Sequence, residues 1–181
     1  MKILVNSTSL ALWHEIIHEA EASCAIVLNE ETEAYLVFLL MRYLKKPEIV
    51  KQVMAEELLE GLHLAARSRE EMLRGVGDKC LLFSGLFPKM AERRLVKISY
   101  FVNLGQSAYG ALAKSNYDLY GSLSRQFVTL MDVLQSIRSY STDFPDLLPL
   151  QAYDLWNETG SQRALKVLGQ YTQAIPKRNF S

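Results

Sequence analysis

One pentapeptide of the chain has residue types that could hold a metal ion: His14-Glu15-Ile16-Ile17-His18. It matches the H-E-x-x-H pattern of zinc peptidases. Residues four apart lie one above the other on an α-helix, so both imidazoles could bind one zinc ion while the carboxylate between them acts as a base. We therefore take His14, His18 and Glu15 as candidate metal-site residues.

A helical wheel turns these three residues away from the expected core. On the wheel, His14 lies about 100° and His18 about 140° from the centre of the apolar face, and Glu15 is nearly opposite it. We expect the motif to face solvent or a flank of the fold, and therefore to contribute two exposed histidines rather than a metal site. A catalytic site would need a third protein ligand, for which Glu56 is one downstream acid. The apolar face comprises Leu10, Trp13, Ile16, Ile17, Ala20, Cys24, Val27 and Leu28.

The same residues allow a second metal chemistry. Glu15-x-x-His18 and Glu60-x-x-His63 are both Glu-x-x-His pairs, and helical di-iron proteins use two such pairs with two further carboxylates. Their ligands project into the bundle. Here the wheel turns Glu60 about 110° and His63 about 170° away from the apolar face of their helix, which argues against a di-iron site.

Three other charged residues lie on faces that the wheel turns inward: Glu33, Glu57 and Arg94. An isolated buried charge is very costly, so buried acids and bases are expected to pair. We expect a partly buried polar network of these three side chains, with a structural rather than a catalytic role. In the alternative, each group reaches water, with Glu33 favoured by the positive end of its helix and Arg94 extending to the surface.

Apolar residues recur every three or four positions along nearly the whole chain, which predicts an all-α fold. We expect a single-domain helical bundle over 1–181, with about five main helices and short helices near the C-terminus. Gly75 and Gly77 should end the third helix, and Ser115 or Asn116 should cap the fifth. The expected helices span about 10–28, 29–44, 47–74, 80–87, 88–113, 117–140, 150–157 and 161–171.

Composition narrows the classes of function. The 181 residues are 49% hydrophobic, and 20 basic residues balance 20 acidic ones. A near-zero net charge argues against a non-specific nucleic-acid binder and against electrostatic membrane attachment. The longest apolar run, Ala34 to Met41, is too short to span a bilayer. Cys24 and Cys80 form no metal or redox motif, so we expect reduced thiols and a cytoplasmic location.

Three stretches of the chain resemble those of uncharacterised all-helical proteins from proteobacteria. They are Glu33-Ala34-Tyr35-Leu36-Val37-Phe38-Leu39-Leu40, Glu57-Leu58-Leu59-Glu60-Gly61-Leu62-His63 and Gly77-Asp78-Lys79-Cys80-Leu81-Leu82-Phe83-Ser84-Gly85-Leu86-Phe87. The resemblance implies a bacterial cytosolic setting. It implies no activity and assigns no role to any residue.

From the sequence we favour a non-catalytic helical interaction or scaffold protein that binds a protein partner or a second copy of itself. This interpretation expects no cofactor, nucleic acid or membrane. The first alternative is a helical-bundle enzyme that depends on zinc or iron. The second is a regulator with a small-molecule pocket lined by aromatic residues: Tyr100, Phe101, Tyr109, Tyr117, Tyr120 and Phe127.

Overall fold

The structure, a computed structural model, describes residues 7–45, 59, 61–63, 65–87, 96–140, 147–174 and 177. These residues contain α-helices and no β-strand, which confirms the all-α prediction. The predicted helix starts at Pro47 and Pro88 lie outside the described residues. The helices are α1 (Ser7–Cys24), α2 (Glu30–Lys45), α4 (Ala66–Leu86), α6 (Ile98–Leu112), α7 (Leu119–Arg125), α8 (Phe127–Ser139), α9 (Pro149–Thr159) and α10 (Gln162–Gly169).

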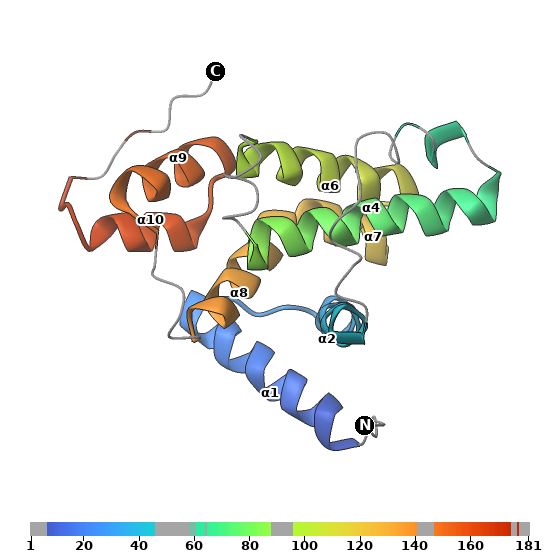
Figure 1. Ribbon diagram of the computed structural model, residues 1–181, viewed down its shortest axis with the longest axis horizontal. Helices are drawn as coiled ribbons and strands as arrows, with labels where there is room; N and C mark the ends of the chain where they lie inside the picture. The colour runs from blue at the N-terminus through green and yellow to red at the C-terminus, as the bar shows by residue number, and fades with distance from the viewer. Residues whose placement is uncertain are drawn as a thin grey trace.

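Two long helices, α4 and α6, lie side by side along the longest axis of the molecule (Figure 1). Helix α8 packs against α4, and α1 packs against α8 on the side away from α4 and α6. Helix α2 contacts α1 and α7, while α9 and α10 pair with each other at one end of the molecule. Helix α1 therefore contacts the rest of the bundle through both α8 and α2.

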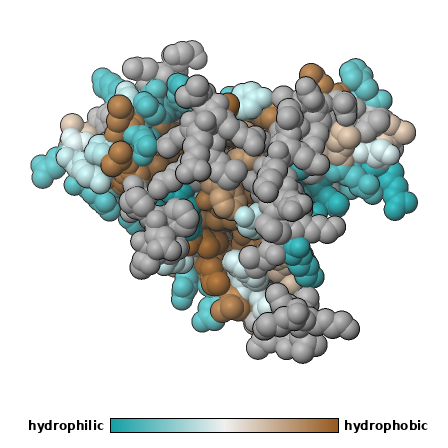
Figure 2. Space-filling model, in the orientation of Figure 1, coloured by the Kyte–Doolittle hydropathy of each residue, from teal (hydrophilic) through white to brown (hydrophobic). Residues whose placement is uncertain are grey.

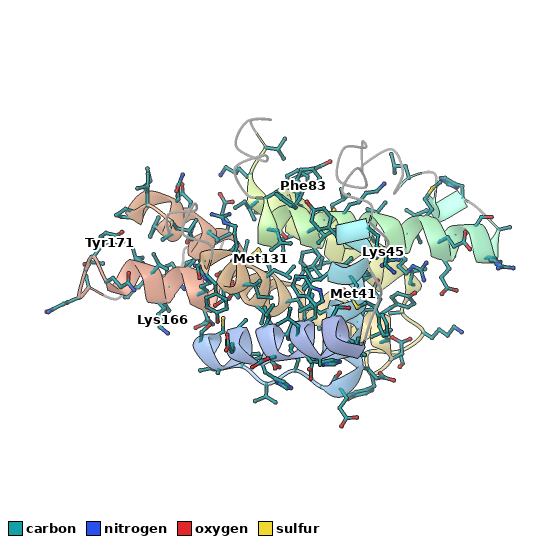
Figure 3. All side chains as sticks on the ribbon, turned by 60° about the horizontal axis from the view of Figure 1, so that its bottom comes forward. Met41, Lys45, Phe83, Met131, Lys166 and Tyr171 are labelled. Carbon is teal, nitrogen blue, oxygen red and sulfur yellow. The ribbon has the colours of Figure 1, made fainter. Side chains whose placement is uncertain are left out.

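One contiguous hydrophobic core includes residues from all eight of these helices. Phe83 of α4 stacks on Phe101 of α6 with ring centroids 5.2 Å apart, and Met131 of α8 is fully buried. Figure 3 shows Phe83 and Met131 within the packed side chains and Tyr171 at the periphery. Burying one such side chain stabilises the fold by about 1.5–3 kcal/mol. In the view of Figure 2, hydrophobic residues gather near the middle of the molecule and hydrophilic ones near its ends.

The prediction that Gly75 and Gly77 end a helix is wrong, because α4 continues through both to Leu86. Glycine weakens a helix by about 1 kcal/mol, but at Gly77 tertiary packing requires it. A Cβ there would collide with the ring of Tyr109, which is fully buried. The missing side chain lets α6 approach α4 closely.

The predicted helix 117–140 is divided at Gln126 into α7 and α8. Asp118, rather than Ser115 or Asn116, caps α7: its side chain accepts a hydrogen bond of 2.7 Å from the Gly121 backbone N–H. The same carboxylate accepts a bond from Lys114 N–H at 2.6 Å. Asp118 therefore fixes the turn after α6 as well as the start of α7.

The last two helices begin and end at residues suited to these positions. Pro149 is the first residue of α9, and Gly160, with φ of 78°, follows its last turn. Ser161 then caps α10. Within the part of the chain that the structure describes, no helix has the length and apolar character needed to cross a bilayer.

Candidate metal centre

The candidate site lies where α1 gives way to α2. Ala25 adopts a left-handed conformation with φ of 55°, and Ile26 N–H donates to the Glu21 carbonyl at 3.0 Å. These features end α1 and reverse the chain. The Asn29 side chain then accepts a bond of 2.8 Å from Thr32 N–H and caps α2. The first turn of α2 is thereby held beside the middle of α1.

At this crossing, one carboxylate oxygen meets both histidines of the pentapeptide. Glu33 of α2 is only 8% exposed. Its Oε1 lies 2.7 Å from Nδ1 of His14 and 3.3 Å from Nε2 of His18. Ligand atoms around a tetrahedral zinc ion lie about 3.4 Å apart. The Glu33–His18 contact is close to this spacing, and the Glu33–His14 contact is shorter by about 0.7 Å, so the side chains of Glu33 and His14 would have to move apart to admit a metal ion.

A second buried carboxylate, Glu21, holds the ring of His18 from the other side. Its Oε2 lies 3.0 Å from His18 Nδ1, and its Oε1 accepts a hydrogen bond of 2.6 Å from Leu28 N–H. Glu21 is 5% exposed. If Nδ1–H of His18 donates to Glu21, Nε2 is left with its lone pair directed towards Glu33. Metal-binding histidines commonly donate their other ring N–H to a carboxylate in this way.

Two sets of three ligands can be drawn from these residues. In the first, His14 Nδ1, His18 Nε2 and a Glu33 oxygen bind the ion, and Glu21 orients His18. Two histidines and one glutamate are the protein ligands of several catalytic zinc sites, which keep a fourth position open. In the second, the ligands are His18, Glu21 and Glu33, whose ligand atoms all lie within 4.8 Å of one another. His14 is not part of that group, so its ring would have to move towards His18 to complete the first set. We favour the first, because Glu21 already bonds to His18 through one oxygen and to Leu28 through the other.

The charges at this crossing also suit a cation. Glu21 and Glu33 are both buried acids, and among the described residues only histidines lie within ion-pair distance of them. Buried carboxylates need a compensating positive charge or hydrogen-bond donors. A divalent ion would supply two positive charges to this pair of carboxylates.

The structure separates what the wheel predicted correctly from what it missed. The side chains of His14 and His18 are 39% and 65% exposed, and Glu15 is exposed, so the motif does face a flank of the fold. Glu33 is buried, as predicted. Its contacts are to the two histidines, whereas Glu57 and Arg94, its predicted partners, lie outside the described residues.

The other acids considered as ligands, Glu56 and Glu60, also lie outside the described residues. His63 is described and is exposed, which does not favour the inward-facing ligand set of a di-iron protein. Sequence reasoning missed Glu21. Its spacing of three residues from His18 was the available signal, since residues i and i+3 are neighbours on a helix.

Comparison of the chain with protein-family models, curated proteins and solved structures found no match. The resemblance to uncharacterised proteobacterial proteins therefore stays a prediction. Any proposal about function has to rest on the residues and their geometry.

Proposed function

We propose that this protein binds one divalent transition-metal ion between α1 and α2, with zinc as the preferred ion. The observation that carries the proposal is the position of Glu33 Oε1, within 2.7 Å of His14 Nδ1 and 3.3 Å of His18 Nε2. Two imidazole nitrogens and one carboxylate oxygen suit zinc, and they also suit ferrous iron. Calcium and magnesium prefer sites made of oxygen atoms alone.

The proposed ligands come from two helices, and this has a structural consequence. Both histidines belong to α1 and Glu33 belongs to α2, so the ion would join the two helices. The exposed side of His18 leaves room for water at a further ligand position. Zinc with such a position acts as a Lewis acid and lowers the pKa of bound water.

An enzymatic version of the proposal adds Glu15 as a general base. On a helical wheel Glu15 points roughly 80° from the mean direction of His14 and His18, beside the proposed ligands rather than among them. It is exposed and thus accessible to a substrate. Glu15→Gln should therefore leave metal affinity unchanged and remove only metal-dependent turnover.

We place metal binding ahead of the functions favoured from sequence alone, because the Glu33 carboxylate lies in contact with the ring nitrogens of His14 and His18. Two other functions stay predictions: an interaction or scaffold role with a protein partner or a second copy of the chain, and regulation by a small molecule. The cytoplasmic location also stays a prediction. None of these conflicts with a metal ion that joins α1 to α2.

The decisive experiment is metal analysis by mass spectrometry on untagged protein purified without a nickel column. We expect about one zinc ion per chain, lost in His14→Ala, His18→Ala and Glu33→Gln. The matched controls are His63→Ala and Glu31→Gln, which alter an exposed histidine and an exposed acid of the same helical turn as Glu33. Both controls should keep the metal.

Two results would overturn the proposal. One is wild-type protein that neither carries zinc nor takes it up in a titration. The other is equal metal loss in the controls and the ligand variants, which would indicate unspecific surface binding. Iron in place of zinc, lost in the same three variants, would keep the site and change the assigned ion. Circular dichroism of every variant checks that the helices are intact.

A further inference from the structure

A second buried polar cluster lies between α2 and α4, around Asp78. This residue is 4% exposed. Its Oδ1 accepts hydrogen bonds from the hydroxyls of Tyr35 at 2.5 Å and Tyr109 at 2.8 Å, and its Oδ2 accepts one from Nη2 of Arg42 at 2.6 Å. Side chains of α2 and α6 thus converge on one carboxylate of α4.

Burying these charged groups between helices has a high desolvation cost. Burial, the largest influence, raises the pKa of Asp78 even though Arg42 and the two tyrosines favour its ionised form. A buried ion pair often stabilises a fold no better than well-packed apolar side chains would. Charged clusters with perturbed pKa values occur at functional sites more often than elsewhere, so the surroundings of Asp78 are a candidate binding site.

A cavity of about 100 Å³ lies directly beside the Asp78–Arg42 pair. It is lined by residues of α2 and α4: Leu39, Arg42, Tyr43, Gly75, Asp78 and Leu82. A Cβ added to Gly75 would meet no atom within 4 Å, so the cavity continues over the bare backbone at this position. The Arg42 side chain is 40% exposed, which connects the cavity to solvent. Figure 3 shows Met41 and Lys45, which flank Arg42, near the end of α2.

The lining has two chemical halves. Arg42 carries five N–H donors, and its bond to Asp78 uses Nη2, so the guanidinium has capacity for a second carboxylate. The positive charge of Arg74 also acts on Asp78. Arg42, Arg74 and Asp78 together therefore carry a net positive charge. Leu39 and Leu82 provide an apolar wall. The volume equals roughly three to four water molecules, enough for a short aliphatic acid.

We propose that this cavity binds a small monocarboxylate of about two to four carbons. The ligand carboxylate lies against Arg42, which then bridges two carboxylates, and the alkyl chain lies against Leu39 and Leu82. Bidentate pairing of arginine with a carboxylate is among the stronger polar contacts in proteins. The site is separate from the candidate metal centre, because Glu33 contacts α1 whereas Arg42 contacts α4.

Titration of the full chain with propionate, followed by ¹H–¹⁵N NMR in the presence of a chelator, tests this proposal. We expect saturable shifts centred on α2 and α4. Arg42→Gln removes the guanidinium and should weaken binding at least about tenfold. Propionamide, which has the same shape without the charge, should also bind at least about tenfold more weakly than propionate.

A pair of glycine variants separates occupancy of the cavity from general damage. Gly75→Leu places an alkyl chain in the cavity and should abolish propionate binding in a folded protein. Gly169→Leu is the matched control, because a Cβ there also meets no atom within 4 Å. It should bind propionate like wild type. His18→Ala should also bind propionate normally, because its defect would lie at the metal centre.

Three results would overturn the inference: no saturable shift with propionate, equal affinity for propionamide, or unchanged binding in Gly75→Leu. The first would leave the cavity to water. The second would remove the assignment of a carboxylate, and the third would place the ligand elsewhere on the protein.

Discussion

The role of Glu21 gives the sharpest prediction about the metal centre. Glu21→Gln keeps the size of the side chain and one carbonyl oxygen. That oxygen can still accept from Leu28 N–H, which the carboxylate binds at 2.6 Å. The new amide NH₂ then faces Nδ1 of His18, where Glu21 Oε2 lies at 3.0 Å in the wild type. Since two donors repel, the imidazole proton moves to Nε2, the nitrogen that would bind the metal.

The size of this effect follows from the position of Glu21 behind the ligand. Loss of such a supporting carboxylate typically lowers metal affinity about 10- to 100-fold, equivalent to roughly 1.4–2.8 kcal/mol. Glu33→Gln removes a ligand and should lower zinc affinity further. Glu19→Gln alters an exposed acid of α1 and should have no effect.

Competition with a chromophoric chelator measures zinc affinity in wild type and in all three variants. Wild-type affinity in Glu21→Gln would refute the orienting role of Glu21. A loss as complete as that of Glu33→Gln would show that Glu21 is itself a ligand, in the alternative arrangement with His18 and Glu33. An intermediate loss supports the arrangement that we favour.

Three further predictions concern the rest of the fold. Gly77→Ala should lower the free energy of unfolding by about 1–2 kcal/mol, since the collision with the Tyr109 ring outweighs the helix propensity gained; urea denaturation equal to wild type would contradict it. Burial raises the pKa of Tyr109 well above its usual 10.0, so its contribution to stability is complete below that pH and is lost as pH rises above it. The melting temperature of Tyr109→Phe should therefore fall less than that of wild type between about pH 9 and about pH 11. An equal fall in both proteins would argue against a pH-dependent contribution of the Tyr109 hydroxyl to stability. Asp132 of α8 accepts hydrogen bonds from Ser161 Oγ at 2.5 Å and from Gln162 N–H at 3.0 Å; Asp132→Asn should cost about 1–3 kcal/mol and speed hydrogen exchange in α10, and unchanged exchange there would count against it.

Features that depend on neighbours in the sequence could be predicted from it. The helical periodicity predicted the all-α class, and the predicted helix 29–44 begins at Asn29, the residue that caps α2. Pro149 in the first turn of α9 also follows a local preference, although the predicted helix began one residue later, at 150. The inward position of Glu33 followed from its place on the wheel, since burial depends mainly on which face of a helix packs.

Features that depend on how helices cross could not be predicted in this way. Helix α4 passes through Gly77 because the ring of Tyr109, from another helix, occupies the place of a side chain. The two histidines were judged by distance from the apolar face. A helical wheel predicts which side chains of one helix are buried. It cannot predict a contact with a side chain of another helix, such as Glu33 of α2. The turn that brings this partner close needs φ of 55° at Ala25, a residue with no preference for that conformation.

Helix α2 joins the two polar sites, and this has a consequence that can be measured. Glu33 holds it to α1, and Tyr35 and Arg42 hold it to Asp78 of α4. If α2 opens as a unit, a metal ion at Glu33 must protect the whole helix, including residues far from the ligands. Zinc at 100 times its dissociation constant would stabilise the closed form by about 2.7 kcal/mol. Hydrogen exchange along α2 should then slow about 100-fold, with exchange in α9 and α10 as the internal control. Slowing confined to the first turn of α2 would show that it opens in parts and that the two sites are independent.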